Sequence, residues 1–131
     1  QNPSSIIIIM EITVVNGANA IARGAIKRFV QSGYSKINLL DQLPFRPSVY
    51  QLQSELNVDI KKHSVRNAGA LQWALEGKED VVYFTHDYFT LAHDKNNLLK
   101  ATAKAAKEVG VKNLVCVCPI EYDYYEWENL E

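Results

Sequence analysis

The chain has little cysteine, little glycine and no long apolar run. Its 131 residues include two cysteines and six glycines. Two cysteines are too few for the disulfide framework of a small secreted domain, and their scarcity favours a reducing compartment. The longest aliphatic run, residues 6–10, ends at Glu11 and is much shorter than the roughly 20 residues that a membrane-spanning helix needs. No transmembrane segment is therefore predicted within this sequence.

An excess of charge of either sign is missing as well. The 14 Lys and Arg residues nearly balance the 15 Asp and Glu residues, which gives a formal net charge of −1. The chain thus lacks the basic footprint of a nucleic-acid-binding domain and the acidic excess of a disordered chain. We expect no nucleic-acid partner. The length predicts one folded domain.

Residues 12–24 predict a buried strand that runs through a tight turn into an amphipathic helix. Residues 6–15 form a β-branched run typical of a central strand covered on both faces. Apolar residues recur at helical spacing from 20 to 31, and Gly17 lies in the turn between the two elements. Parallel α/β domains use this unit to present the N–H groups of a helix to a phosphate.

The same strand-and-helix pattern repeats along the chain. Further strands are predicted over residues 36–40, 58–65, 80–85 and 113–118, and further helices over 48–56, 68–75 and 95–109. Residues 42–48, which contain two prolines, and residues 86–94 are expected to be loops. Strands that alternate with helices predict a parallel sheet with right-handed crossovers. Residues 120–131 are expected to form a separate tail.

Four stretches resemble, in this order and spacing, the N-terminal portion of the short-chain dehydrogenase/reductase superfamily. They are residues 16–20, 37–41, 74–83 and 105–115, and the resemblance extends from residue 12 to about 119. The similar branches are the extended and atypical ones, which include sugar-nucleotide epimerases, NmrA-like regulators and the Rossmann-type accessory subunit of mitochondrial complex I. The resemblance implies an α/β, Rossmann-like three-layer domain of the NAD(P)-binding type over residues 1–119. Its parallel sheet should have about five strands and be truncated after the fifth.

The family's glycine fingerprint is only partly present. Its three glycines correspond to Gly17, Ala20 and Arg23, so two of the three are replaced. Alanine adds a methyl group where the pyrophosphate should approach, and Arg23 hinders close packing of helix on strand unless Gly24 restores it. Arg23 is either a charge-assisted phosphate contact or an exposed helix cation. The cofactor contacts that the resemblance implies in this segment are Gly17, Asn19, Ala20, Ile21 and Arg23.

Further cofactor contacts are implied at the ends of later strands. Asp41 ends the second strand, where the family binds the ribose hydroxyls of NAD, although a loop cap or a solvated carboxylate is the alternative. Arg46 is a candidate for a 2′-phosphate, which would favour NADP. Ser64 with Val65 occupies the adenine-binding position without the family's usual Asp. His86 follows the fourth strand, and it is either a cofactor contact or a solvated loop residue.

The catalytic residues of the family are not found, and no metal site is predicted. Cys118 stands in the region of the catalytic Ser, and none of the tyrosines from 122 to 125 is followed by a Lys four residues later. The usual dehydrogenase chemistry requires that Lys to lower the Tyr pKa. Cys116 and Cys118 lie on one face of a strand and lack the two further ligands of a zinc site.

The tail has a composition typical of an interface. Residues 121–131 contain no Lys or Arg. Their five carboxylates and four aromatic residues are Glu121, Tyr122, Asp123, Tyr124, Tyr125, Glu126, Trp127, Glu128 and Glu131. It is either an arm that docks on a basic partner or the start of a further element. The apolar fifth strand, as an open sheet edge, would also invite pairing. We therefore expect protein subunits of a larger complex as partners, through this edge and residues 121–131.

The leading hypothesis is a non-catalytic subunit with a structural or accessory role in a larger assembly, such as mitochondrial respiratory complex I, that retains weak or structural binding of NAD or NADP. The mitochondrial location follows from the resemblance alone, and the cytoplasm is the alternative. Two other functions stay open: the N-terminal fragment of an active NAD(P)-dependent reductase or epimerase, and an NmrA-like dinucleotide sensor. Sequence beyond residue 131 with a Tyr and a Lys four residues apart would favour the enzyme.

Overall fold

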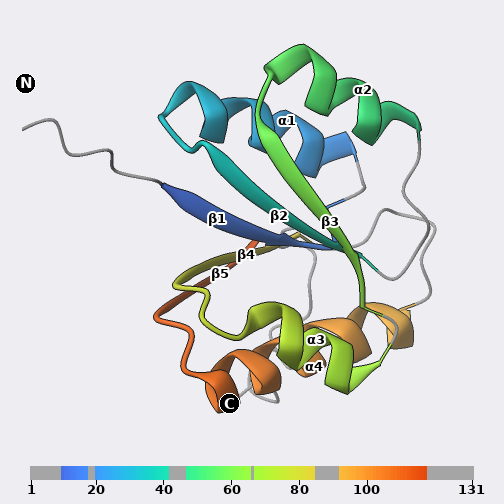
Figure 1. Cartoon of the computed structure of the whole chain (residues 1–131). Coiled ribbons are helices and arrows are strands. Elements are labelled where there is room, and N and C mark those ends of the chain that lie inside the picture. The colour runs from blue at the N-terminus through green and yellow to red at the C-terminus, as the bar shows by residue number, and fades with distance from the viewer. Residues whose placement is uncertain (1–9, 18–19, 42–46, 66, 85–91, 118–131) are drawn as a thin grey trace, which may run out of the picture.

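The computed structural model describes residues 10–17, 20–41, 47–65, 67–84 and 92–117. Strands and helices alternate along the chain, as Figure 1 shows. In order, they are β1 (Glu11–Val15), α1 (Ala20–Gln31), β2 (Lys36–Asp41), α2 (Pro47–Leu56), β3 (Asp59–Ser64), α3 (Ala68–Leu75), β4 (Asp80–Phe84), α4 (Ala92–Val109) and β5 (Asn113–Val117).

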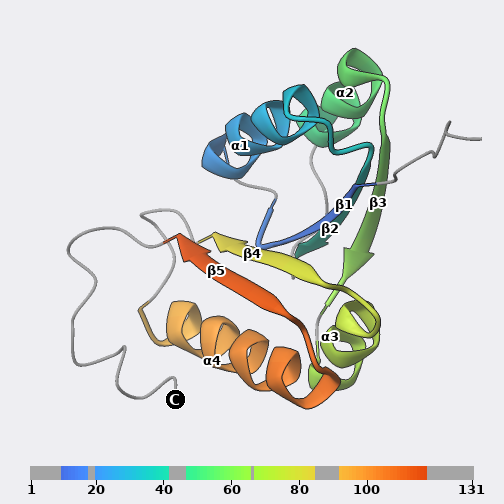
Figure 2. The same ribbon diagram turned by 90° about the vertical axis from the view of Figure 1, so that its left-hand side faces the viewer.

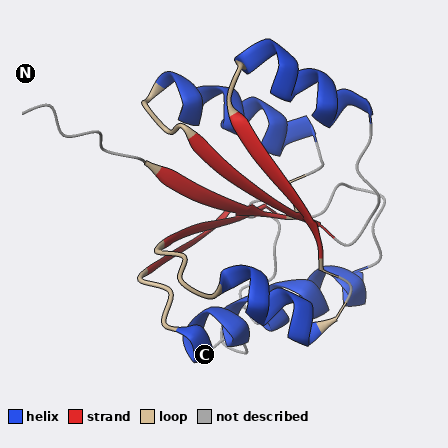
Figure 3. Ribbon diagram, in the orientation of Figure 1, coloured by secondary structure: helices blue, strands red, loops and turns tan. Residues whose placement is uncertain are grey.

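The strands form one parallel sheet in the order β3-β2-β1-β4-β5. β1 pairs with β2 in the register Ile12↔Ile37 and with β4 in the register Thr13↔Val81. The helices α1 and α2 cover one face of the sheet, and α3 and α4 cover the other, as the colouring of Figure 3 makes plain. The expected three-layer Rossmann-like fold with five parallel strands is therefore confirmed.

Each face of the sheet has its own hydrophobic core. Because successive side chains of a strand point to opposite faces, Val14 and Leu39 pack under α1 and α2, whereas Val15 and Leu40 pack under α3 and α4. All four side chains are fully buried. Double coverage explains why the sequence of β1 and β2 is almost continuously apolar instead of alternating.

Two loop predictions are wrong at their edges. Pro47 was expected in the loop before a helix that starts at Ser48, but it is itself the first residue of α2, because proline fits the first position of a helix, whose N–H has no partner within the helix. Residues 92–94 were also expected in a loop but belong to α4. That segment contains neither glycine nor proline, so nothing in it stops the helix from extending toward its N-terminus.

The strand β5 lies at one edge of the described sheet and is covered on one face by α4, as Figure 2 shows. Its other face carries Val115 and Val117, which are 55% and 41% exposed. Among the described residues no helix is both long and apolar enough to cross a membrane. The tail at residues 121–131 lies outside the residues that the structure describes.

Candidate functional site

The carboxyl ends of the strands meet at one edge of the sheet, and the strand order reverses there at β1. The chain leaves β1 toward α1 on one face and leaves β4 toward α4 on the other, so the two connections diverge between neighbouring strands. Open α/β sheets bind their ligands at such a switch point. The turn after β1 therefore lies where a ligand site is expected.

Asn16 forms this turn and joins β1 to its two neighbours. Its backbone adopts the left-handed conformation with φ 61°, which asparagine tolerates better than most residues. The Asn16 N–H donates to the carbonyl of Leu40 on β2 over 2.7 Å, and its Nδ2 donates to the carbonyl of Phe84 on β4 over 2.8 Å. With only 5% of the residue exposed, these bonds hold the three strand ends together.

Gly17 is needed for packing inside the protein. A Cβ atom at this position would lie 2.1 Å from Cδ1 of Leu39 and 3.0 Å from Cγ1 of Val14. Both neighbours are fully buried. The first glycine of the fingerprint thus lets the turn pass close over the core, which brings the start of α1 to the switch point.

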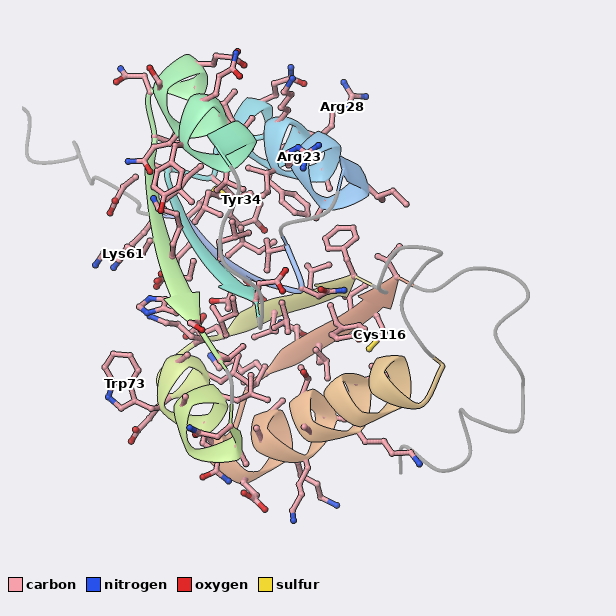
Figure 4. The ribbon with its side chains drawn as sticks, turned by 90° about the vertical axis from the view of Figure 1, so that its right-hand side faces the viewer. Arg23, Arg28, Tyr34, Lys61, Trp73 and Cys116 are labelled. Carbon is pink, nitrogen blue, oxygen red and sulfur yellow. The ribbon has the colours of Figure 1, made fainter. Side chains whose placement is uncertain are left out.

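The first turn of α1 fits an anionic group. It contains no acidic residue and it includes Arg23, which is half-buried. The N–H groups of a first helical turn have no partners within the helix and carry a partial positive charge. Backbone donors and a guanidinium together match a phosphate. In Figure 4, Arg23 and Arg28 both lie on α1, with Arg23 nearer the start of the helix.

The ends of β2 and β3 complete the described part of this edge. Asp41 and Ser64 are partners in the parallel register, and the N–H of Val65 donates to the carbonyl of Asp41 over 2.9 Å. Asp41 is only 3% exposed, so the alternative of a solvated carboxylate is wrong. Ser64 is exposed and Val65 is buried.

The structure thus brings most of the expected cofactor contacts to one edge of the sheet. Gly17, Ala20 and Arg23 lie where β1 passes into α1, whereas Asp41 and Ser64 with Val65 lie at the ends of the two strands beside it. The side chain of Ile21 is 69% exposed. Asn19 and His86, like Arg46, lie outside the described residues. Their roles in cofactor binding stay predictions.

A second polar region lies on the sheet face that α3 and α4 cover. Asn38 is 1% exposed, and its Nδ2 donates to Oε2 of Glu11 over 2.6 Å and to Oγ1 of Thr13 over 3.2 Å. Glu11 also pairs with Lys78 at 3.2 Å and with Lys36 at 3.7 Å. Burial raises the pKa of Glu11. The hydrogen bonds from Asn38 and Lys78 and the charges of Lys78 and Lys36 together lower it by more, so the pKa lies below its ordinary value.

His63 extends this polar region onto the edge strand β3. Its ring meets Trp73 of α3 edge to face, with the ring centres 5.8 Å apart. The pKa of His63 lies below its ordinary value of 6.5, because partial burial disfavours the charged ring and because Lys78 and Lys61 repel it. The imidazole is therefore neutral at pH 7.

This shift predicts a pH dependence of stability. The unfolded chain binds a proton at His63 more readily than the folded chain, so the free energy of unfolding should fall as the pH drops through 6.5 toward the lower pKa of the folded state. Chemical denaturation between pH 7.5 and about 5 measures the slope. The substitution His63→Phe keeps an aromatic ring against Trp73 and should flatten that slope. An unchanged slope would contradict the shift.

Metal and thiol chemistry find little support in the described part of the chain. Within it, no group of three His, Cys, Asp or Glu side chains lies close enough to hold a metal ion. Cys116 on β5 is half-buried against the core beneath α4, and burial raises the pKa of its thiol. A raised pKa keeps the sulfur protonated and unreactive. Cys118 lies outside the described residues.

Comparison with solved structures finds several reductases of the same fold. The triphenylmethane reductase of Citrobacter sp., solved with NADP(H), matches with a TM-score of 0.65 and 14% sequence identity over 91% of this chain and 44% of that one. The NADPH-dependent quinone oxidoreductase of Escherichia coli, solved with NADPH, matches with a TM-score of 0.61 and 16% identity over 80% of this chain and 35% of that one. A structure from work on pinoresinol-lariciresinol and phenylcoumaran benzylic ether reductases has a TM-score of 0.67, with 14% identity over 91% of this chain and 43% of that one.

These similarities concern the fold. The chain spans between about a third and a half of the length of these three structures. No protein-family profile matches the sequence. No curated protein matches it either. The Rossmann fold that the resemblance implied is thus confirmed.

Two parts of the site were not expected from the sequence. Asn16 was treated only as part of the turn, although asparagine directly before the turn glycine is itself a signal for a left-handed backbone. The polar region around Asn38 and His63 does not follow from the sequence, because β3 is only weakly patterned. Lys61 and His63 do lie on one face of β3, but Lys62 on the other face breaks the polar-apolar alternation that would have marked this region.

Proposed function

We propose that this chain is the dinucleotide-binding part of an NAD(P)-dependent reductase. The observation that carries the proposal is the β1-turn-α1 unit at the switch point of the sheet, whose first helical turn combines N–H donors and Arg23 without any acidic residue. Structures of the same fold contain NADPH or NADP(H), which supports the choice of ligand. The bound nicotinamide would supply a hydride. The described residues would bind and orient the phosphates.

Two features define how the cofactor would be held. Gly17 lets β1 turn closely into α1, and the positive N-terminal end of α1 would then point at the pyrophosphate. Arg23 replaces the third glycine. The close packing of helix on strand that a glycine allows is lost there, and Arg23 would instead supply a charge-assisted hydrogen bond to the phosphate. Asp41, which is deeply buried at the end of β2, would lie on the adenosine side of the bound cofactor.

Titration of the chain with NADPH tests this proposal. We expect saturable binding by calorimetry, and Arg23→Ala should weaken it by about 10-fold, the effect of one charge-assisted hydrogen bond. Arg28→Ala is the matched control, because Arg28 is exposed further along the same helix and bonds only to its neighbour Gln31 and, through its carbonyl, to Ser32 among the contacts described. The same titration is repeated with NADH. Absence of binding of both dinucleotides at millimolar concentration would overturn the proposal.

A non-catalytic accessory subunit is the second candidate. It is favoured by the replacement of two fingerprint glycines with Ala20 and Arg23, and by the exposed Val115 and Val117 on the edge strand β5. An exposed apolar strand at an edge is suited to pairing with another chain. The association with mitochondrial complex I and the mitochondrial location stay predictions from the resemblance. Co-purification of intact assemblies from the native source would test them.

A further inference from the structure

A pocket of about 370 Å³ lies on the side of the sheet formed by the edge strand β3 and the end of α3. Figure 4 shows Lys61 of β3 and Trp73 of α3 on this same side of the molecule. It is separate from the switch point, which lies at the turn from β1 to α1. The side chains that matter for its chemistry are Asn38, Lys61, His63, Trp73, Glu76 and Lys78.

The floor of the pocket contains a buried hydrogen-bond acceptor. The carboxylate of Glu11 can only accept, so the NH₂ group of Asn38 must face it. That group donates to Glu11 and Thr13, both on β1, which places the amide oxygen on the side away from β1 and toward β3. Among the described residues no donor reaches this oxygen, although Asn38 is 1% exposed. A buried acceptor without a partner calls for a donor from elsewhere.

The walls of the pocket add an aromatic surface and a positive charge. Trp73 is 69% exposed and stands edge to face against the neutral ring of His63. Lys78 is paired with Glu11, whereas Lys61 is exposed and has no carboxylate partner within the described part of the chain. Glu76 also lines the pocket and is exposed, so its carboxylate stays in water beside the lysines Lys61 and Lys78. Because Lys78 is already paired with Glu11, Lys61 is the cation of this pocket that can pair with an anionic ligand.

From these three features we propose that the pocket binds a small planar aromatic anion that carries an O–H or N–H donor. The donor bonds to the amide oxygen of Asn38, the anionic group pairs with Lys61, and the ring packs against Trp73. The volume suits a molecule of one ring with two substituents, since ligand pockets start at roughly 300 Å³. The site is independent of the dinucleotide site, and neither proposal rests on the other.

Binding of 4-hydroxybenzoate to the full chain tests the proposal. The chain has two tryptophans, so Trp127→Phe leaves Trp73 as the sole tryptophan and makes its fluorescence a local reporter. We expect a saturable change with a Kd below about 1 mM, which is within the range for a ligand of this size. Benzoate lacks the donor and phenol lacks the charge. Each should bind about 10-fold more weakly.

Two charge-matched variants test whether the ligand binds beside Lys61. Lys61→Glu should weaken 4-hydroxybenzoate by about 10-fold or more, whereas Lys104→Glu, the same change at an exposed position of α4, should leave its affinity unchanged. NADPH should not displace it. The proposal is overturned if no saturation occurs by about 10 mM, if both variants act alike, if benzoate binds as well as 4-hydroxybenzoate, or if NADPH competes. Competition by NADPH would leave the dinucleotide site intact while removing this one.

Discussion

Gly17→Ala is expected to lower the free energy of unfolding by about 1–3 kcal/mol, the usual cost of forcing an extra methyl group into a packed interior. The new Cβ would lie 2.1 Å from Cδ1 of Leu39, far inside contact distance. Leu39 is fully buried beneath α1 and α2, so its side chain can move away only by repacking the core around it. Urea denaturation measures the change in unfolding free energy. The displaced turn should also weaken NADPH binding if the proposed function is correct.

Gly24→Ala is the matched control on the adjoining helix. Nothing lies within 4 Å of a Cβ built at Gly24, and the residue is exposed inside α1. Alanine should therefore stabilise the protein by about 0.5–1 kcal/mol through higher helix propensity. Opposite signs for the two glycines are the expected result. Equal, small effects at both positions would show that the turn at Gly17 adapts without cost.

The fold was predictable because its signals are local and repeated. The apolar run of β1, the turn at Gly17 and the helical spacing of α1 together indicate one strand-turn-helix unit, and the later units repeat it. Parallel order followed from the helical connections between strands. The errors fell at the starts of α2 and α4, where proline is accepted at the first helical position and residues 92–94 contain no helix breaker.

The site was predictable only in outline. The order of the strands places Asp41 and Ser64 beside one another, so their proximity followed from the fold. The depth of burial of Asp41 could not be inferred, because a carboxylate after a strand is as typical of an exposed turn as of a buried one. The pocket beneath α3 depends on how far an eight-residue helix covers the sheet, which periodicity does not encode.

The switch point itself is held by a side chain, and removing that side chain should be costly. The last registered pair between β1 and β4 is Val15↔Tyr83, and the Nδ2 of Asn16 continues the ladder by donating to the carbonyl of Phe84. We expect Asn16→Ala to lower the free energy of unfolding by about 2–4 kcal/mol. Part of this loss comes from the buried carbonyl of Phe84, which would be left without its donor. The other part comes from the left-handed backbone, which alanine tolerates poorly.

Asn16→Gly separates the two contributions. Glycine accepts a φ of 61° without strain but cannot donate to Phe84, so it should cost less than alanine by about 1 kcal/mol. Thermal and urea denaturation of the three proteins measure the order, asparagine above glycine above alanine. If glycine restored full stability, the bond to Phe84 would contribute nothing and only the backbone conformation would matter. If glycine and alanine were equal, the turn would carry no strain, and the bond that joins β1 to β4 would account for the whole effect.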